Sequence, residues 1–158
     1  MKNYARILNY VCVVLMLVLL VTQFLPFWSC EKCEDGVASI SDYTWFPNDH
    51  KPITTEMKEI YGRDYLVTDV VLTSILILVA SGLGIFFCIK DARKPLSAIF
   101  PLAAGLCGVV GYLTTPGLQT GENWVIHVAV AAVLAVCALG ALSQLIVNLV
   151  KAKAASKK

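Results

Sequence analysis

Apolar residues form four long runs that contain almost no charged side chains. The runs cover about residues 7–27, 65–89, 96–114 and 124–150. A helix needs about 20 apolar residues to cross a hydrocarbon core of roughly 30 Å. Backbone groups in lipid must find hydrogen-bond partners within their own segment, so each run is predicted to be a helix. The sequence therefore predicts an all-α integral membrane protein, with residues 1–158 forming a single membrane domain, a four-transmembrane-helix bundle.

The composition supports the same prediction. The chain has 158 residues, of which 58% are hydrophobic and 15% are charged, whereas a soluble domain is roughly 45–50% apolar and about 25% charged. A globule of this size cannot hide so much apolar surface from water. The composition excludes a soluble enzyme, a disordered chain and a nucleic-acid-binding module.

Basic residues predict how the bundle is oriented. Nine of the thirteen lie before the first run, between the second and third, or after the fourth: Lys2, Arg6, Lys90, Arg93, Lys94, Lys151, Lys153, Lys157 and Lys158. Basic residues flanking spans stay in the cytoplasm. Both termini, including a tail at 151–158, are therefore expected inside, where the basic residues favour anionic lipid. A bacterial inner membrane is the expected location.

The segment between the first two runs, residues 28–64, is expected to be a structured extracytoplasmic loop. Apolar residues at helical spacing predict a short amphipathic helix at about 55–61. Upstream, Tyr43, Trp45 and Phe46 form an aromatic cluster. Aromatic rings prefer the membrane interface, so the cluster is either part of an interfacial belt or a docking surface for a partner.

Two of the six cysteines, Cys30 and Cys33, form a Cys-x-x-Cys sequence in this outer loop. They are interpreted as a disulfide that stiffens the loop, as a redox-active dithiol, as part of a metal site completed by His50 or an acid, or as free thiols. No metal site is assigned. The other four cysteines lie within the spans, where buried cysteine usually behaves as a small apolar residue.

A Cys-x-x-Cys in the first outer loop of a four-helix membrane protein resembles the DsbB family of quinone-dependent, disulfide-generating enzymes. The resemblance covers the number of spans, the orientation and Cys30–Cys33. It implies a thiol–disulfide oxidoreductase that uses quinone. DsbB-type enzymes have a second cysteine pair in the other outer loop, whereas residues 115–123 contain none. Vitamin K epoxide reductases are also four-helix redox proteins, with the Cys-x-x-Cys inside a helix; here the fourth run has the single Cys137.

Polar residues inside the spans are candidates for function, because they are costly in lipid. Gln23, Asp69 and His127 are each expected about one turn from the outer end of a span. Together they could form a polar cluster that binds a quinone headgroup or an ion, or relays a proton. Alternatively they are solvated or make structural hydrogen bonds.

Small residues mark the expected helix contacts, because they let backbones approach closely. The third run contains Gly105, Gly108 and Gly111, and the second contains Ala80 and Gly84. These positions serve either packing within one bundle or self-association through the third helix.

The chain has no phosphate loop, dinucleotide fingerprint, zinc-protease motif or nucleophile elbow. The expected function is a non-enzymatic assembly, accessory or scaffolding subunit that contacts partners or further copies through its outer loop and helix faces. No catalytic residue and no cofactor is assigned. The expected partners are the lipid bilayer and either further copies of the chain or another membrane protein, without nucleic acid. Two alternatives stay open: a thiol–disulfide oxidoreductase using Cys30, Cys33 and quinone, and an oligomeric pore or small transporter.

Overall fold

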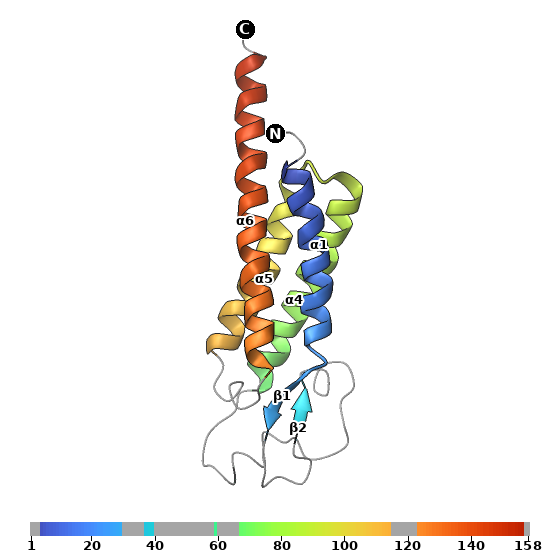
Figure 1. Ribbon diagram of the computed structural model, residues 1–158, viewed down its shortest axis with the longest axis vertical. Coiled ribbons are helices and arrows are strands. Elements are labelled where there is room, and N and C mark those ends of the chain that lie inside the picture. Colours follow the sequence, from blue (N-terminus) through green and yellow to red (C-terminus); the bar gives the residue numbers. More distant parts are fainter. Residues whose placement is uncertain (1–3, 30–36, 40–58, 60–66, 115–122, 157–158) are drawn as a thin grey trace.

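The computed structural model describes residues 4–29, 37–39, 59, 67–114 and 123–156. These residues form four helices and two short strands, namely α1 (Tyr4–Thr22), β1 (Pro26–Ser29), β2 (Val37–Ser39), α4 (Val67–Asp91), α5 (Leu96–Thr114) and α6 (Trp124–Ala155). The helices lie alongside one another as a bundle, and each runs opposite to the preceding one (Figure 1). The start of α1 and the end of α6 therefore lie at the same end of the bundle, and the strands lie at the other.

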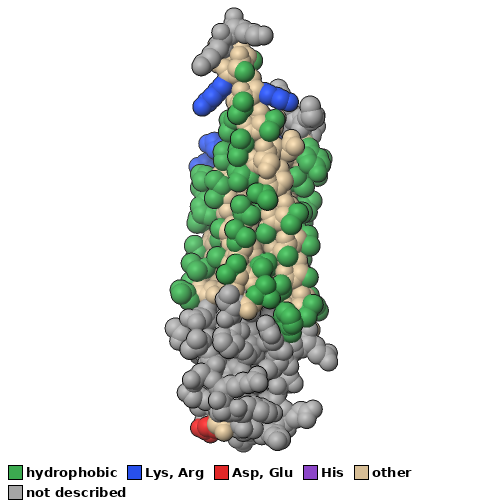
Figure 2. Space-filling model, turned by 90° about the vertical axis from the view of Figure 1, so that its left-hand side faces the viewer, with side chains coloured by type: hydrophobic (Ala, Val, Ile, Leu, Met, Phe, Trp, Pro, Cys, Tyr) green, Lys and Arg blue, Asp and Glu red, His purple; other side chains and the backbone are tan. Residues whose placement is uncertain are grey.

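Three helices are long and apolar enough to cross a membrane: α1, the stretch Val71–Asp91 of α4, and α6. In α5 the corresponding apolar stretch, Leu96–Gly111, is shorter. Hydrophobic side chains cover the body of the bundle on the face seen in Figure 2, and Lys and Arg side chains gather toward one end. The prediction of a helical protein is confirmed, with three helices that are compatible with membrane spans.

The first helix ends earlier than the sequence prediction of about residue 27, because α1 stops at Thr22. The amides of residues 23–25 bond to carbonyls three residues back, which tightens the chain into a final turn. Pro26 lacks an N–H and disfavours helical geometry at the residue before it. The chain then continues as β1 instead of helix.

The last helix extends beyond the predicted limit near residue 150 and reaches Ala155. Alanine and lysine, which make up residues 151–155, are strong helix formers. The Ser156 amide bonds to the Ala152 carbonyl at 3.1 Å and closes the final turn. Part of the predicted tail is thus a helical projection from the bundle.

A two-stranded antiparallel sheet adjoins the outer end of α1 and was not predicted from the sequence. In its register Pro26 faces Ser39 and Ser29 faces Val37, with an irregularity between Pro26 and Trp28. Strands this short produce no detectable alternation of apolar and polar residues. The predicted helix at 55–61 lies outside the described residues except for Glu59.

The core lies between the helices in two clusters. The larger contains Cys12, Met16, Leu19, Ile77 and Leu134, all fully buried among residues of α1, α4, α5 and α6. The smaller lies nearer the chain ends and contains Ala5, Ala98, Ala141 and Leu145. Small side chains dominate the second cluster, so the helices approach closely there.

Candidate functional site

The end of the bundle that adjoins the strands holds three buried polar side chains, which come from α6 and from the end of α1. Thr22 ends α1 and Gln23 follows it, while His127 lies in the first turn of α6. Gln23 and His127 are completely buried and Thr22 is nearly so. A buried polar group costs free energy unless it is hydrogen-bonded, so the contacts of these side chains decide what they do.

A hydrogen bond links the two helices at this point. Thr22 Oγ1 lies 2.6 Å from His127 Nδ1, and the same hydroxyl donates to the Leu19 carbonyl at 2.7 Å. A hydroxyl has one proton, so when Leu19 receives it, Nδ1 of the imidazole must be the donor toward Thr22. When the hydroxyl instead donates to Nδ1, the ring proton lies on Nε2, so the bond fits either tautomer.

The structure describes the side chains of two of the three residues that were predicted to form a polar cluster, Gln23, Asp69 and His127. Gln23 and His127 are both buried at the outer end. Asp69 lies in the first turn of α4, and the placement of its side chain lies outside what the structure describes. Thr22 was missed by sequence reasoning, because threonine in a span commonly bonds to a carbonyl of its own helix and so carries no distinctive signal.

The cysteine pair Cys30 and Cys33 lies outside the described residues, so its disulfide stays a prediction. The strands on either side are described, and Ser29 faces Val37 in their register. Both cysteines therefore belong to the connection between β1 and β2. The aromatic residues Tyr43, Trp45 and Phe46 also lie outside the described residues.

The other four cysteines, Cys12, Cys88, Cys107 and Cys137, are free thiols. Cys12 and Cys88 are buried. Within the described residues, no group of three or more His, Cys, Asp or Glu side chains is placed to hold a metal ion.

The glycines predicted as packing positions on α5 face their neighbours within the chain. A Cβ atom at Gly105 would lie 2.7 Å from the Ala135 nitrogen and 2.8 Å from the Ala131 oxygen, which are both backbone atoms of α6. At Gly108 it would lie 2.6 Å from the Ala131 Cβ. Only glycine allows α5 and α6 to approach this closely.

The contact between α4 and α5 is similar but involves side chains. A Cβ atom at Gly111 would meet Thr73 of α4. One at Gly84 would lie 3.1 Å from Cδ of Pro101 in α5 and 2.8 Å from the sulfur of Met16 in α1. Ala80 is part of the buried core. The small residues of α4 and α5 are therefore used for packing within one chain.

A second polar contact, at the end of the bundle where α1 begins, was missed by sequence reasoning. The Asn9 side chain of α1 is fully buried. Its Nδ2 donates to the Ala92 carbonyl at 2.7 Å and to Ser97 Oγ at 2.8 Å. Ser97 Oγ in turn donates to the Lys94 carbonyl at 2.7 Å. The signal was available, since an asparagine in an apolar run is costly unless it bonds to another segment.

No protein-family model, curated protein or solved structure matches this chain. In this bundle the first helix is hydrogen-bonded to the other segments by buried side chains near both of its ends. Thr22 and His127 connect α1 to α6, and Asn9 connects it to the link between α4 and α5.

Proposed function

We propose that this protein is a four-span membrane protein with both termini in the cytoplasm. It acts as a non-enzymatic accessory or scaffolding subunit that presents its outer loop to a partner membrane protein. The observation that carries the proposal is the double attachment of α1. Residues 23–66 connect α1 to α4, so the loop leaves from a helix end that the Thr22–His127 bond holds in place.

The role of His127 supports a scaffold more than a catalyst. Its ring is completely buried and its Nδ1 is bonded to Thr22. A general acid or base must reach the proton that it transfers, directly or through one water. A histidine used to fix the angle between two helices stabilises the frame from which the loop projects.

The distribution of charge supports the orientation. Arg6 lies in the first turn of α1, Lys90 in the last turn of α4, and Arg93 and Lys94 in the link to α5. Lys151 and Lys153 lie near the end of α6. Figure 2 shows Lys and Arg side chains gathered toward one end of the molecule. Such residues stay on the cytoplasmic side. A helix of the length of α5, 19 residues, spans about 28 Å, which matches a hydrocarbon core of roughly 30 Å. A fourth crossing through α5 is therefore part of the proposal.

The orientation is tested by labelling single cysteines in intact cells with a membrane-impermeant maleimide, in a chain whose native cysteines are replaced by serine. Ser156→Cys is expected to react only after permeabilisation, whereas Glu59→Cys reacts in intact cells. Reaction of Ser156→Cys but not Glu59→Cys from outside would contradict the orientation, and reaction of both from outside would contradict the number of crossings.

The scaffold function is tested by photo-crosslinking in cells from the aromatic cluster. A crosslinking amino acid at Trp45 is expected to capture one defined membrane protein, because aromatic residues are enriched in binding surfaces. The matched control places the same group at Val136, an α6 residue that is 71% exposed and faces lipid. Products that contain only this chain, or no product at all, would overturn the accessory function.

A thiol–disulfide oxidoreductase is a second candidate, favoured by the β1–β2 register that brackets Cys30 and Cys33. In this function the Cys30–Cys33 disulfide takes two electrons from a substrate dithiol and oxidises it to a disulfide. A quinone then accepts the two electrons and two protons from the reduced pair. A redox potential near those of catalytic dithiols, with loss of substrate oxidation in Cys30→Ser, supports this candidate. A pair that resists mild reductant removes it.

A further inference from the structure

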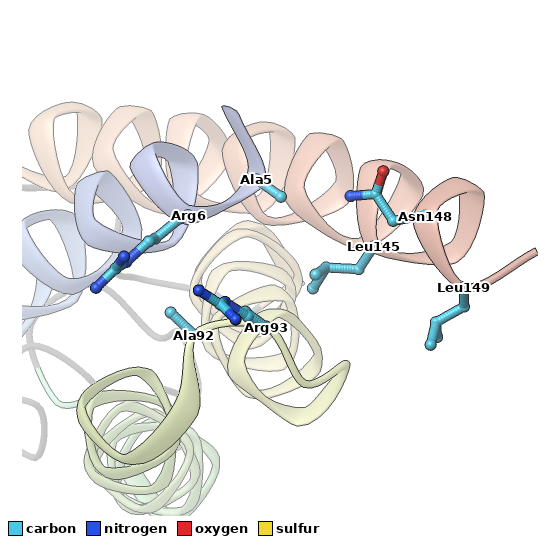
Figure 3. Close-up of a pocket in the computed structure, with 7 residues that line it drawn as sticks. All are labelled: Ala5, Arg6, Ala92, Arg93, Leu145, Asn148 and Leu149. Carbon is cyan, nitrogen blue, oxygen red and sulfur yellow. The ribbon is translucent and has the colours of Figure 1, made fainter. Parts of the chain in front are cut away.

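The inner end of the bundle contains a cavity of about 460 Å³ that the outer-loop function does not use. Three separate parts of the chain surround it: the first turn of α1, the link between α4 and α5, and the last third of α6 (Figure 3). The cavity lies at the basic end of the bundle, at the level where lipid headgroups meet a cytoplasmic surface.

The lining combines two fixed positive charges with a polar side chain. Arg6 comes from α1, Arg93 from the link between α4 and α5, and Asn148 from the opposite side on α6 (Figure 3). Arginine is the side chain best suited to phosphate, because its guanidinium presents several N–H donors in a plane. The described lining residues include no aspartate or glutamate.

The Arg6 side chain contacts an aromatic ring on its own helix. Its guanidinium carbon lies 5.8 Å from the centre of the Tyr10 ring, one turn later on α1. A cation over an aromatic face at this distance is attracted to it. Tyr10 lines a second, smaller cavity beside this one, so the contact restrains Arg6 at the boundary between the two cavities.

A neighbouring cavity of about 200 Å³ offers a useful contrast. It shares Arg6 and Arg93 with the larger cavity but also includes Asp91. The Asp91 carboxylate accepts a hydrogen bond from the Arg93 amide at 3.1 Å. This carboxylate would repel an anion, but Lys90 also lines the smaller cavity and offsets its charge. The larger cavity is favoured instead by its volume and by its lining, which holds no acidic residue.

The floor of the larger cavity is apolar. Ala5 and Leu145 are almost completely buried beneath it, and Leu149 at its edge is 47% exposed. Leu149 continues into the lipid-facing surface of α6, where Ile146 and Val150 are also exposed. A ligand with both a phosphate and hydrocarbon chains would match the cavity and the adjoining surface together, whereas free phosphate would match only the charges.

We propose that this cavity binds the headgroup of an anionic phospholipid from the cytoplasmic leaflet. Arg6 and Arg93 bind the phosphate, Asn148 bonds to a headgroup oxygen, and the acyl chains lie along the apolar surface beside Leu149. Basic pockets between helices on the cytoplasmic side are typical lipid-headgroup sites. The inference does not depend on the outer-loop function.

Native mass spectrometry of the full chain in detergent tests the inference, because a micelle carries no charged lipid surface and reports individual bound lipids. Phosphatidylglycerol, with net negative charge, is expected to bind more tightly than phosphatidylcholine, whose phosphate is neutralised by choline. Arg6→Gln and Arg93→Gln should each weaken phosphatidylglycerol binding about tenfold, since a hydrogen bond to a charged group is worth at least that factor.

Lys153→Gln is the matched control, because it removes one exposed positive charge that does not line the cavity. It should leave phosphatidylglycerol binding unchanged. An equal loss in Lys153→Gln and in the arginine variants would overturn the site and indicate diffuse attraction.

Inorganic phosphate distinguishes the two sources of the anion. An excess of phosphate is expected to leave phosphatidylglycerol bound, because it cannot use the apolar surface. Displacement of the lipid by phosphate, or arginine-dependent binding of phosphate alone with equal affinity, would overturn the lipid assignment. Melting of each variant in the same detergent checks that the fold is kept, and Asn148→Leu supplies a second variant whose lipid affinity should fall about fivefold.

Discussion

Helices α1 and α5 both pack against α6, but they are held in different ways. At α5 the contact is made by backbone, since Gly105 lies directly against the backbone of Ala131 and Ala135. At α1 the contact with α6 includes the Thr22–His127 hydrogen bond near one end of the helix. Near the other end, Asn9 bonds to Ala92 and Ser97, which belong to the α4–α5 link and to α5. One interface relies on close approach and the other on polar side chains.

The difference follows from how each helix is connected. The link between α4 and α5 is short, and residues 92–95 bring the two helices together locally. The first helix is joined to the rest only through residues 23–66, so its position must be specified by tertiary contacts. Lipid provides no hydrophobic drive between helices, and buried hydrogen bonds or close packing must supply the specificity.

The largest effect is expected where the close approach of α5 is broken. Gly105→Ala places a Cβ within 3 Å of the α6 backbone, which cannot move aside as a side chain can. The free energy of unfolding should fall by about 3 kcal/mol. Reversible unfolding in mixed micelles, followed by circular dichroism, measures it. Gly82→Ala, which meets nothing within 4 Å, is the control, and an equal loss in both variants would show that the contact is not tight.

The inner attachment of α1 comes next. Asn9→Leu removes the donor to Ala92 and Ser97 and leaves both acceptors buried. The expected loss is about 2 kcal/mol, the cost of unsatisfied buried acceptors, measured by the same unfolding method. Ser143→Ala is the control, because its hydroxyl is exposed and bonds only within α6. Full stability in Asn9→Leu would mean that α1 does not depend on this contact.

The outer attachment is expected to be weaker, because it is a single bond between side chains. Thr22→Val keeps the shape of the side chain but removes the hydroxyl next to His127. The loss should be about 1 kcal/mol, in the range measured for hydrogen bonds inside membranes. Thr22→Ser, which keeps the hydroxyl, should recover most of it. A valine variant as stable as the original chain would leave α1 attached at its inner end alone.

The smallest effect is a gain in stability. Gly140 faces the flexible end of Leu8, which would lie 3.4 Å from an added Cβ, so α1 and α6 have room there. Gly140→Ala should raise the free energy of unfolding by about 0.5 kcal/mol through the lower entropy of the unfolded chain. A loss comparable to that of Gly105→Ala would show that α1 and α5 pack equally tightly against α6.

Sequence reasoning succeeded for features that depend on the average hydropathy of a long segment. The helices follow from runs of about 20 apolar residues, and the buried roles of Gly105 and Gly108 agree with the small-residue signal. It failed where a single residue decides where a helix ends, as at the end of α1 near Pro26. It also failed for Asn9 and Thr22, whose partners are 83 or more residues away in the chain.

The sequence by itself indicates that the helices are suited to lipid, which segments are helical and which end of the bundle is basic. These features depend on composition and on the spacing of residues along the chain. Only the tertiary structure decided which polar side chains form hydrogen bonds with one another and that Arg6, Arg93 and Asn148 line the same cavity. Helix rotation and crossing geometry set those meetings, and both result from the sum of many weak contacts across the bundle. These contacts join segments that are far apart in the chain, so no single segment of the sequence predicts them.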